Sequence, residues 1–490
     1  MKNNETDQLR VRHTGPILKP SSTRVLLRAF NPTTKQRSLQ IIARICALPE
    51  EKVLSELAQI LREFADRHRR LQDYWLRRFE HVKALLLTDM RISAERKLLI
   101  GAYFTQEYAL EGAALFNPSL VWHPDQSGVS PGSQRFVLSL RATGEGHISS
   151  IAFRTGIVDA QNQIKVDELT RFVVSPENIS YPLYDRTLFE RKLHEMDHRD
   201  LLITSVLSTL AEKFTLEELK FSVQLVERQN RGKPENVLQL NSMLTLARAN
   251  YVASFSLEQP LFERILFPTS PTEINGIEDA RFVAFHEEDG KVIYYATYTA
   301  YDGKITMPQL LQTEDFLTFE MSTLNGSEIH NKGMALFPRR IKGHYAMLSR
   351  QDNENIYIMY SDHLHFWYTK EILLKPTYPW EYVQLGNCGS PIETEAGWLV
   401  LTHGVGPMRQ YAIGAILLDK DDPSRVIGRL HEPLLTPNPS EREGYVPNVV
   451  YSCGAQIHNN ELILPYAMSD YASNFAVIPM EYILGAMKLT

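Results

Sequence analysis

A short charged string in the sequence GIEDARF holds two carboxylates and a guanidinium, at Glu278, Asp279 and Arg281. A positioned carboxyl group can transfer a proton to or from a substrate when its surroundings tune its pKa. Asp279 is therefore a candidate general acid. The other interpretation is a structural ion-pair turn, because charged triplets in loops often pair with each other, and the residues alone favour the turn.

Motifs for several other chemistries are missing from the sequence. It contains no CxxC pair, no EF-hand loop and no P-loop. We therefore expect no metal site and no cofactor. The three cysteines, Cys46, Cys388 and Cys453, are too few and too scattered for a disulfide framework, and we expect all three to be reduced and buried.

The first part of the chain has the periodicity of helices. From Pro49 to about Leu87, apolar residues recur at three- and four-residue spacing, and a second helical run is expected from Ala94 to about Leu115. We predict a helical extension over residues 1–112, which we interpret as a packing or oligomerisation element. The protein is accordingly expected to form a homo-oligomer.

After Asn117 the sequence pattern changes to short apolar or alternating runs between turn residues, as in RFVLSLRA, KVIYYATYTA and GWLVLTHG. This pattern predicts a mainly β domain over residues 113–490, and its repeated turns and aromatics favour a propeller over a sandwich. A helical insertion is expected at about 183–235, where Thr215 and Glu218 form a capping box.

Charge and hydropathy limit the classes of partner. The 490 residues carry a formal net charge of -6 and a pI near 6.2, so neither nucleic acid nor an anionic membrane is an expected partner. The N-terminus lacks the apolar core of a signal peptide, and no stretch reaches the roughly 18 apolar residues of a spanning helix. We therefore predict a cytoplasmic globular protein.

Eight strings, in this order along the chain, resemble glycoside hydrolase family 130. Each string alone is weak, but their number and order make the resemblance specific over most of 117–487. Residues 1–110 and the helical insertion lie outside it. The strings are NPS from Asn117, LRATGEGH ending at His147, GIEDARF from Gly276, TAYDG from Thr299, NKGMALFPRRIKGHYAMLSR from Asn331, GNCGSPIETEAGWLVLTHGV from Gly386, YAIGAILLD from Tyr411 and EREGYVPNVVYSCGA ending at Ala455.

The resemblance implies a fold and a reaction. Members of the family resemble five-bladed β-propellers, and they cleave β-mannosidic linkages with inversion. The match implies that Asp279 is the catalytic acid, which protonates the leaving oxygen indirectly through a sugar hydroxyl. We expect a raised pKa for this carboxyl, because a general acid must carry its proton at the working pH.

The resemblance also implies an anion site, because phosphorylases of the family bind phosphate with basic residues at four matching places. Gln384 stands where a lysine is usual, so the site is less positive than is typical. Hydrolytic members place carboxylates in this region, and no acidic residue matches them around His363 to His365 or at His403. We therefore favour phosphorolysis, with inorganic phosphate as co-substrate. The implied phosphate-binding residues are Lys332, Arg350, Gln384, His403 and Tyr411.

Sugar recognition needs polar groups that bond adjacent hydroxyls. Asp302 and Asp470 could instead be Asx-turn residues, a common role for aspartate beside glycine or serine. Four aromatics, Tyr298, Tyr301, Trp367 and Tyr445, are candidates for stacking on sugar faces, although most aromatics of such a fold are core. The residues that the resemblance places around the mannose are Asn117, Arg141, Glu278, Asp302, Glu443 and Asp470.

The leading hypothesis is an inverting phosphorylase that converts a β-linked manno-oligosaccharide and phosphate into α-mannose 1-phosphate. Within the enzyme class, the alternatives are an inverting β-mannosidase, for which Gln384 would mark lost phosphate binding, and a β-mannosyltransferase, since phosphorolysis is reversible. The third alternative is a glycan-binding propeller without catalysis. The presence of Asp279 argues against it, because sugar binding does not require an acid.

Overall fold

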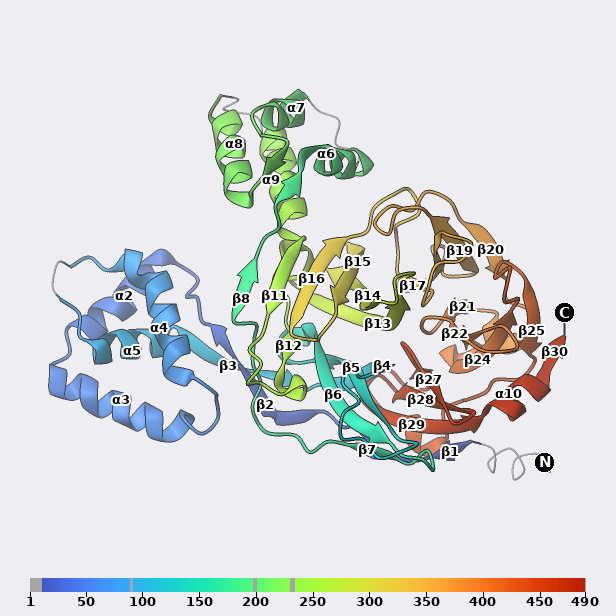
Figure 1. The fold of residues 1–490 in the computed structure, drawn as a ribbon. Helices are drawn as coiled ribbons and strands as arrows, with labels where there is room; N and C mark the ends of the chain where they lie inside the picture. The colour runs from blue at the N-terminus through green and yellow to red at the C-terminus, as the bar shows by residue number, and fades with distance from the viewer. Residues whose placement is uncertain (1–10, 89–90, 197–200, 230–233, 490) are drawn as a thin grey trace.

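Strands are the main regular structure of the chain from residue 105 onward, and nearly all of them pair antiparallel. The computed structural model describes residues 11–88, 91–196, 201–229 and 234–489. The protein is mainly β, and its sheets succeed one another around a common centre (Figure 1). Within the described ranges, no helix is both long and apolar enough to cross a membrane.

The largest sheet joins two antiparallel series of strands. A parallel pairing of Gly276 with Ser149 links the series β4–β5–β6 to the series β13–β14–β15–β16, which continues through β11 to β8. Two short strands, β7 and β12, also pair with β6. The strands are β4 (Ala114–Trp122), β5 (Gln134–Thr143), β6 (Ser149–Val158), β7 (Ile164–Val166), β8 (Asn178–Ser180), β11 (Tyr251–Ser254), β12 (Ile265–Leu266), β13 (Gly276–His286), β14 (Val292–Tyr301), β15 (Thr306–Thr313) and β16 (Thr318–Thr323).

Three further sheets follow, in the orders β17–β18–β19–β20, β21–β23–β24–β25–β30 and β1–β29–β28–β26, where β1 (Arg12–His13) comes from the N-terminal part of the chain. Their bounds are β17 (Ala335–Leu336), β18 (Tyr345–Ser349), β19 (Ile356–Ser361), β20 (Glu371–Leu374), β21 (Gln384–Asn387), β22 (Ile392–Glu393), β23 (Trp398–Val405), β24 (Tyr411–Leu418), β25 (Val426–Leu430), β26 (Val450–Tyr451), β27 (Gln456–His458), β28 (Glu461–Met468), β29 (Ala472–Pro479), α10 (Met480–Ala486) and β30 (Met487–Leu489). Short 3-10 turns connect several strands: η2 (Glu145–His147), η3 (Leu261–Glu263), η4 (Pro271–Glu273), η5 (Pro379–Glu381), η6 (Pro407–Arg409) and η7 (Pro439–Glu441).

Aromatic side chains fill the core of the largest sheet. Phe153 stacks on Phe319 with ring centroids 5.7 Å apart, and it also meets Phe282 edge-on at 6.1 Å. All three rings are buried. Because burying one such ring contributes about 1.5–3 kcal/mol, this cluster holds β6, β13 and β16 in fixed relation.

The N-terminal part combines helices with strands, which the sequence did not predict. β1 (Arg12–His13) pairs with β29, and β2 (Ser21–Ala29) pairs with β3 (Thr105–Glu111). The helix expected from Ala94 to about Leu115 ends at Tyr103, because the chain then enters β3 and β4. The expected run from Pro49 to Leu87 is likewise divided. The helices are α2 (Lys35–Cys46), α3 (Glu50–Phe64), α4 (Leu71–Val82) and α5 (Ala94–Tyr103), with the short turn η1 (Lys83–Leu85).

Helices also occupy the expected insertion, and they continue beyond its expected end. Thr215 and Glu218 form the predicted capping box: the Glu218 carboxylate accepts from the Thr215 backbone N–H at 2.7 Å, and Thr215 Oγ1 accepts in return at 3.2 Å. Residues 197–200 and 230–233 of this insertion, like residues 1–10 of the N-terminal extension, lie outside the described residues. The elements are β9 (Tyr184–Asp185), α6 (Arg186–Glu195), α7 (Leu201–Ser208), β10 (Lys213–Phe214), α8 (Leu216–Gln229) and α9 (Pro234–Arg248).

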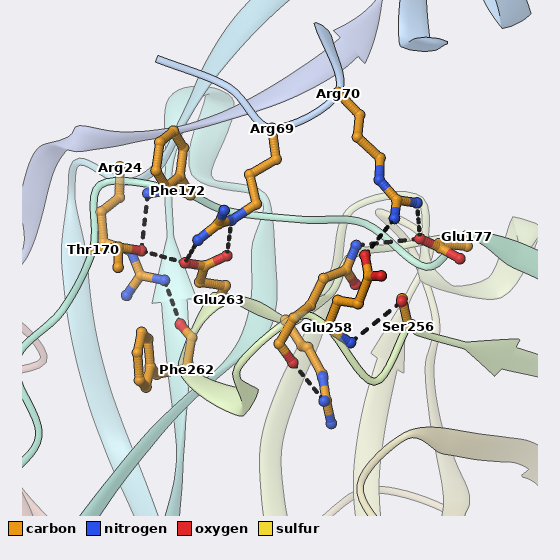
Figure 2. Close-up of polar contacts among 12 residues, drawn as sticks. Arg24, Arg69, Arg70, Thr170, Phe172, Glu177, Ser256, Glu258, Phe262 and Glu263 are labelled. Atoms are coloured by element: carbon orange, nitrogen blue, oxygen red, sulfur yellow. Dashed lines mark hydrogen bonds and ion pairs between the residues drawn. The ribbon is translucent and has the colours of Figure 1, made fainter. Parts of the chain in front are cut away.

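Two arginines in the loop between α3 and α4 join the N-terminal helices to the β-sheets (Figure 2). Arg69 donates from Nε and Nη2 to the fully buried Glu263 carboxylate at 2.6 and 2.8 Å. Arg70 donates to Glu177 at 2.6 Å and to Glu258 at 2.9 Å. A buried carboxylate that loses its partner is strongly destabilising, so the Arg69–Glu263 pair fixes this junction.

The cysteines are free, as expected, but only two of them are buried. Cys388 and Cys453 are fully buried, whereas Cys46 is partly exposed at the end of α2. The expectation of burial is therefore wrong for Cys46, because the last turn of a surface helix leaves its side chain partly open to solvent.

Candidate active site

A β-bulge in β13 sets the position of Asp279. The register of β13 against β14 shifts between Glu278 and Arg281, and Asp279 itself has a left-handed backbone with φ 53. Such a bulge re-aims a side chain out of the regular alternation of a strand. The Asp279 side chain is only 8% exposed, so its carboxylate has to be satisfied by protein or ligand groups.

The partners of Asp279 come from β4 and β5. Its Oδ1 accepts a hydrogen bond from Asn117 Nδ2 at 2.7 Å and a longer one from Arg141 Nη1 at 3.3 Å. Arg141 also donates from Nη2 to Glu278 Oε1 at 2.7 Å, and its Nε is fixed by Ser149 Oγ at 2.9 Å. The predicted residues Asn117, Arg141, Glu278 and Asp279 therefore form one group, which we call the Asp279 cluster.

Arg281 connects the backbone of Asp279 to neighbouring strands by hydrogen bonds, a role that the sequence does not predict. Its guanidinium donates to the Asp279 backbone carbonyl at 3.0 Å, to the Cys388 carbonyl at 2.9 Å and to the Tyr451 hydroxyl at 2.7 Å. The side chain is buried throughout. The interpretation of Glu278, Asp279 and Arg281 as a local ion-pair turn is therefore wrong, because Glu278 and Asp279 pair with Arg141 of β5.

The carboxyl groups of Asp279 and Asp470 have pKa values that are shifted in opposite directions. Burial alone would raise the pKa of Asp279, but the charges of Arg141 and Arg281 outweigh it and hold that pKa well below its ordinary value of 3.8. Lys332 acts in the same direction. The expectation of a raised pKa for Asp279 is therefore wrong for this arrangement of charges.

The raised pKa belongs instead to Asp470. Burial and then the negative charge of Asp279 raise the pKa of Asp470 to about 6, against the opposing charge of Arg141. Asp470 has a left-handed backbone, with φ 49, in the turn between β28 and β29. The Leu115 backbone N–H donates to the carbonyl of Tyr471, the residue after Asp470, at 2.9 Å, so Asp470 lies near β4, the strand that carries Asn117.

A second group of predicted residues surrounds Arg350, which directly follows β18. Arg350 Nη1 lies 3.5 Å from His403 Nε2, and the His403 ring stacks on Tyr411 at 5.9 Å with an interplanar angle of 11°. We call Arg350, His403 and Tyr411 the Arg350 cluster. Tyr451 joins the two clusters, because its hydroxyl accepts from Arg281 and its ring lies edge-on to His403 at 4.9 Å.

Two glycines leave the space that Arg350 occupies. A Cβ on Gly333 would lie 2.4 Å from Arg350 Nε, and one on Gly386 would lie 2.8 Å from Arg350 Cδ and 2.5 Å from His403 Cε1. Gly333 also has a positive φ of 92°. Both positions therefore exclude a side chain, for steric reasons and at Gly333 for backbone reasons as well.

The Arg350 cluster contains a buried donor without a protein partner. Arg350 Nε makes no hydrogen bond within the part of the chain that the structure describes. Burial and then the charge of Arg350 lower the pKa of His403 well below its ordinary value, so the imidazole is neutral at neutral pH. Unpaired buried polar atoms in a native protein commonly mark the place of a ligand or water.

Lys332 and Gln384 lie at the edges of the two clusters. Lys332 Nζ is 3.9 Å from Glu278 Oε2 and its side chain is 36% exposed. Gln384 is the first residue of β21 and pairs with Val405, two residues from His403. Because side chains at alternate positions of a strand share a face, Gln384 lies on the face of Gly386.

Two other predicted residues, Asp302 and Glu443, do not join these clusters. The carboxylate of Asp302 accepts from the backbone N–H groups of Lys304 and Ile305 at 2.8 and 2.7 Å, which is the Asx-turn alternative. Glu443 is exposed. Its carboxylate makes no hydrogen bond or ion pair with any described residue.

The stacking hypothesis is wrong for two of the four aromatics. Tyr298 and Trp367 are core residues, 2% and 0% exposed, so neither can present a ring face to a sugar. The Tyr298 hydroxyl bonds Glu273, and the Trp367 indole donates to the Leu364 carbonyl. Tyr301 is partly exposed and Tyr445 is 66% exposed.

The arrangement combines one buried, bonded carboxylate with a nearby guanidinium and imidazole. Such a site can move a proton at Asp279 and hold an anion or a polar ligand at the Arg350 cluster. Among the described residues, no group of three or more His, Cys, Asp and Glu side chains could hold a metal ion. The fold and the site are therefore those of a mainly β enzyme.

Comparison with known proteins identifies the family. A family model described as beta-1,4-mannooligosaccharide phosphorylase matches residues 254–489. A 1,2-beta-oligomannan phosphorylase from Thermoanaerobacter sp. (strain X514) is 37% identical over 216 residues, which are 43% of this chain and 71% of that protein. A beta-1,2-mannobiose phosphorylase of the same organism is 33% identical over 269 residues, 52% of this chain and 82% of that protein.

Among solved structures, the beta-1,2-mannobiose phosphorylase from Listeria innocua in complex with beta-1,2-mannobiose aligns with 77% of this chain and 92% of its own, at 22% identity and a TM-score of 0.46. The sequence relatives are sufficient for the assignment. This chain belongs to glycoside hydrolase family 130, as its eight sequence strings indicated.

Proposed function

We propose that this protein is an inverting β-mannoside phosphorylase, which uses phosphate to cleave a β-linked manno-oligosaccharide and releases α-mannose 1-phosphate. The observation that carries the proposal is the contact between two clusters through Tyr451: a buried carboxylate at Asp279 on one side, and Arg350 with His403 on the other. A phosphorolytic site needs both a proton donor and an anion site within the length of one sugar.

In this proposal Asp279 supplies the proton for the leaving oxygen, and its neighbours hold the mannose. Asn117 and Arg141 orient the Asp279 carboxylate by hydrogen bonds of 2.7 and 3.3 Å. Glu278 and Asp470 offer carboxylate oxygens that can accept from adjacent sugar hydroxyls. Asp302 is not included, because its carboxylate already caps a turn.

Phosphate would bind at the Arg350 cluster. The unpaired Arg350 Nε is a charged donor, and the neutral His403 can donate from one ring nitrogen while the other accepts. Lys332, with its partly exposed ammonium, and the Tyr411 hydroxyl complete the donors. Gln384 contributes a neutral amide where a lysine would add charge.

Phosphate binding also offers a way to load the proton on Asp279. The cations Arg141, Arg281 and Lys332 hold the pKa of this carboxyl low. A phosphate dianion beside Lys332 and Arg350 would offset part of that positive field and raise the pKa of Asp279 toward the range of a general acid. The basic limb of the pH–rate profile, which reports loss of the proton from the acid, should therefore move to higher pH as the phosphate concentration rises, and a basic limb that stays fixed would contradict this coupling.

We also propose that the sheets form a five-bladed β-propeller. The blades would be the series β4–β7, β13–β16, β17–β20, β21–β25 and β26–β29, each a set of consecutive and mostly antiparallel strands. The parallel pairing at Gly276 and Ser149 would then lie between the first two blades. Family membership and the ring-like succession of sheets in Figure 1 support this arrangement.

The proposal is tested by incubating the protein with β-1,2- and β-1,4-linked mannobiose, with and without phosphate. We expect cleavage only when phosphate is present, and loss of cleavage in Asp279→Asn, which keeps the shape of the side chain. Equal release of free mannose without phosphate would show a β-mannosidase instead. An Asp279→Asn protein as active as the native one would remove Asp279 from the mechanism.

A further inference from the structure

The turn between β5 and β6 carries an exposed histidine, His147, which follows Arg141 of the Asp279 cluster by six residues. Arg141 lies two residues before the end of β5, and Ser149 is the first residue of β6. Their side chains are joined by the 2.9 Å hydrogen bond from Arg141 Nε to Ser149 Oγ. His147 lies between them, with a left-handed backbone at φ 58. Any movement of the turn therefore moves His147 relative to Arg141.

His147 meets an aromatic ring from a distant part of the chain. Its ring lies 5.5 Å from that of Tyr445, tilted by 31°. The Tyr445 segment is placed by its neighbours: the Val446 backbone N–H donates to the Ser469 carbonyl at 3.0 Å, next to Asp470. The His147 ring thus lies in the turn that follows Arg141, and the Tyr445 ring lies in a segment that is hydrogen-bonded to the residue before Asp470.

The N-terminal strand β3 holds the His147 turn in place. The Tyr108 hydroxyl lies 3.0 Å from the Glu145 carbonyl and 3.1 Å from the Ile148 carbonyl, and its one hydrogen serves both. Burial raises the pKa of Tyr108 to about 12, so the hydroxyl stays a donor. Gly144 lies so close to β3 that a Cβ on it would be 2.1 Å from the Ala109 carbonyl oxygen.

We propose that Tyr108 is a positioning residue for the leaving-group sugar: it fixes the turn at 145–148 so that His147 and Tyr445 form the surface on which that sugar rests. The inference rests on the proposed function. It also gives the N-terminal strand pair β2–β3, which lies outside the matched residues 254–489, a part in substrate binding.

The chemistry of the ring pair favours a sugar over phosphate. Neither ring offers the fixed cationic donors that the Arg350 cluster presents, and Tyr445 is 66% exposed, so a ring face is open. Exposed aromatic faces suit the apolar faces of pyranose rings, while the Tyr445 hydroxyl and the imidazole nitrogens can bond sugar hydroxyls. The acceptor side of the cleaved bond is therefore the part that this surface would bind.

The test is steady-state kinetics of Tyr108→Phe in the direction of synthesis, with α-mannose 1-phosphate as donor and mannose as acceptor. We expect the acceptor KM to rise about fivefold, the equivalent of one hydrogen bond, with kcat and the donor KM within about twofold of the native values. His147→Ala should raise the same KM. In the His147→Ala background, Tyr108→Phe should add less than about twofold, because the hydroxyl acts through His147.

Tyr184→Phe is the matched control. The hydroxyl of this buried tyrosine also donates to a backbone carbonyl, that of Ala247 at 2.9 Å, but within the helical insertion. Three results would overturn the inference. The acceptor KM could rise equally in Tyr184→Phe, or stay unchanged in Tyr108→Phe. The effects of Tyr108→Phe and His147→Ala on this KM could also be additive in the double variant. An absence of phosphate-dependent chemistry in the native protein would instead overturn the proposed function on which it rests.

Discussion

Asn117 Nδ2 donates a hydrogen bond to Asp279 Oδ1 across 2.7 Å, and both residues hold a left-handed backbone, with φ 50 and φ 53. The pair lies at register shifts in β4 and β13, where each strand departs from regular pairing. Two irregular backbones that deliver one short, charge-assisted hydrogen bond indicate a site in which the orientation of the carboxylate is fixed before substrate binds.

Replacing Asn117 by glycine keeps the left-handed backbone and removes only the amide. Since a hydrogen bond to a charged group contributes about 1.5–3 kcal/mol, we expect kcat/KM of Asn117→Gly to fall roughly 10- to 100-fold. The control is Asn353→Gly, an exposed asparagine with φ 60. A variant at 117 that retains the activity of this control would show that Asn117 does not orient Asp279.

Gly386 is expected to be essential for phosphate binding. An added methyl would lie 2.5 Å from His403 Cε1 and 2.8 Å from Arg350 Cδ, so Gly386→Ala must displace one of these side chains. We expect the phosphate KM to rise about tenfold or more, from an overpacking strain of about 1–3 kcal/mol, while the mannoside KM changes little. The control is Gly485→Ala, where the methyl meets nothing. If Gly386→Ala raised the mannoside KM as much as the phosphate KM, the Arg350 cluster would not be a specific phosphate site.

Asp470 should make stability depend on pH. Its pKa is raised from 3.8 to about 6 in the folded protein, so the folded state holds this proton more tightly than the unfolded chain. The stabilisation from the bound proton is complete below the unfolded pKa and is lost as the pH rises through about 6. Asp470→Asn removes this loss, and its stability relative to the native protein should grow by about 1–1.5 kcal/mol between pH 5 and pH 8.

The measurement is denaturant unfolding of both proteins across that pH range. A difference in unfolding free energy that is constant with pH would show that Asp470 does not titrate there. If the stability of Asp470→Asn relative to the native protein fell toward pH 8, the pKa of Asp470 would be lowered on folding and not raised.

The net charge near Arg350 should set the affinity for phosphate. Arg350→Ala is expected to raise the phosphate KM strongly, because it removes the buried cation of the cluster. Gln384→Lys should act in the opposite direction and lower the phosphate KM by about fivefold, because residue 384 shares a strand face with Gly386. Gln312→Lys, on the distant strand β15, adds the same charge as a control. If neither Arg350→Ala nor Gln384→Lys changes the phosphate dependence, these residues do not face the nucleophile.

Local signals in the sequence predicted local structure well. The capping box of Thr215 and Glu218 forms as expected, because both partners lie within one helical turn. The helix beginning at Ala94 was predicted to run to about Leu115, but it ends at Tyr103. The reason is long-range: Thr105–Glu111 pairs with Ser21–Ala29, about 80 residues earlier, and periodicity carries no information on such a partner.

The candidate site shows the same difference between local and long-range information. The family resemblance predicts Asp279 and Arg141 as site residues, and the structure brings them together. Arg281 and Tyr451 were missed as site residues, because their hydrogen bond joins positions 170 residues apart. The low pKa of Asp279 was missed for the same reason, since it depends on cations that converge only in the folded chain.

The most direct test of phosphorolysis is to follow phosphorus during the reaction. Phosphorus-31 and proton NMR of the native protein with β-1,2-mannobiose and phosphate should show inorganic phosphate falling as a single α-configured mannose 1-phosphate appears, one for each mannose released. Two mannoses released per disaccharide with phosphate unchanged, or a β-configured sugar phosphate, would contradict the account.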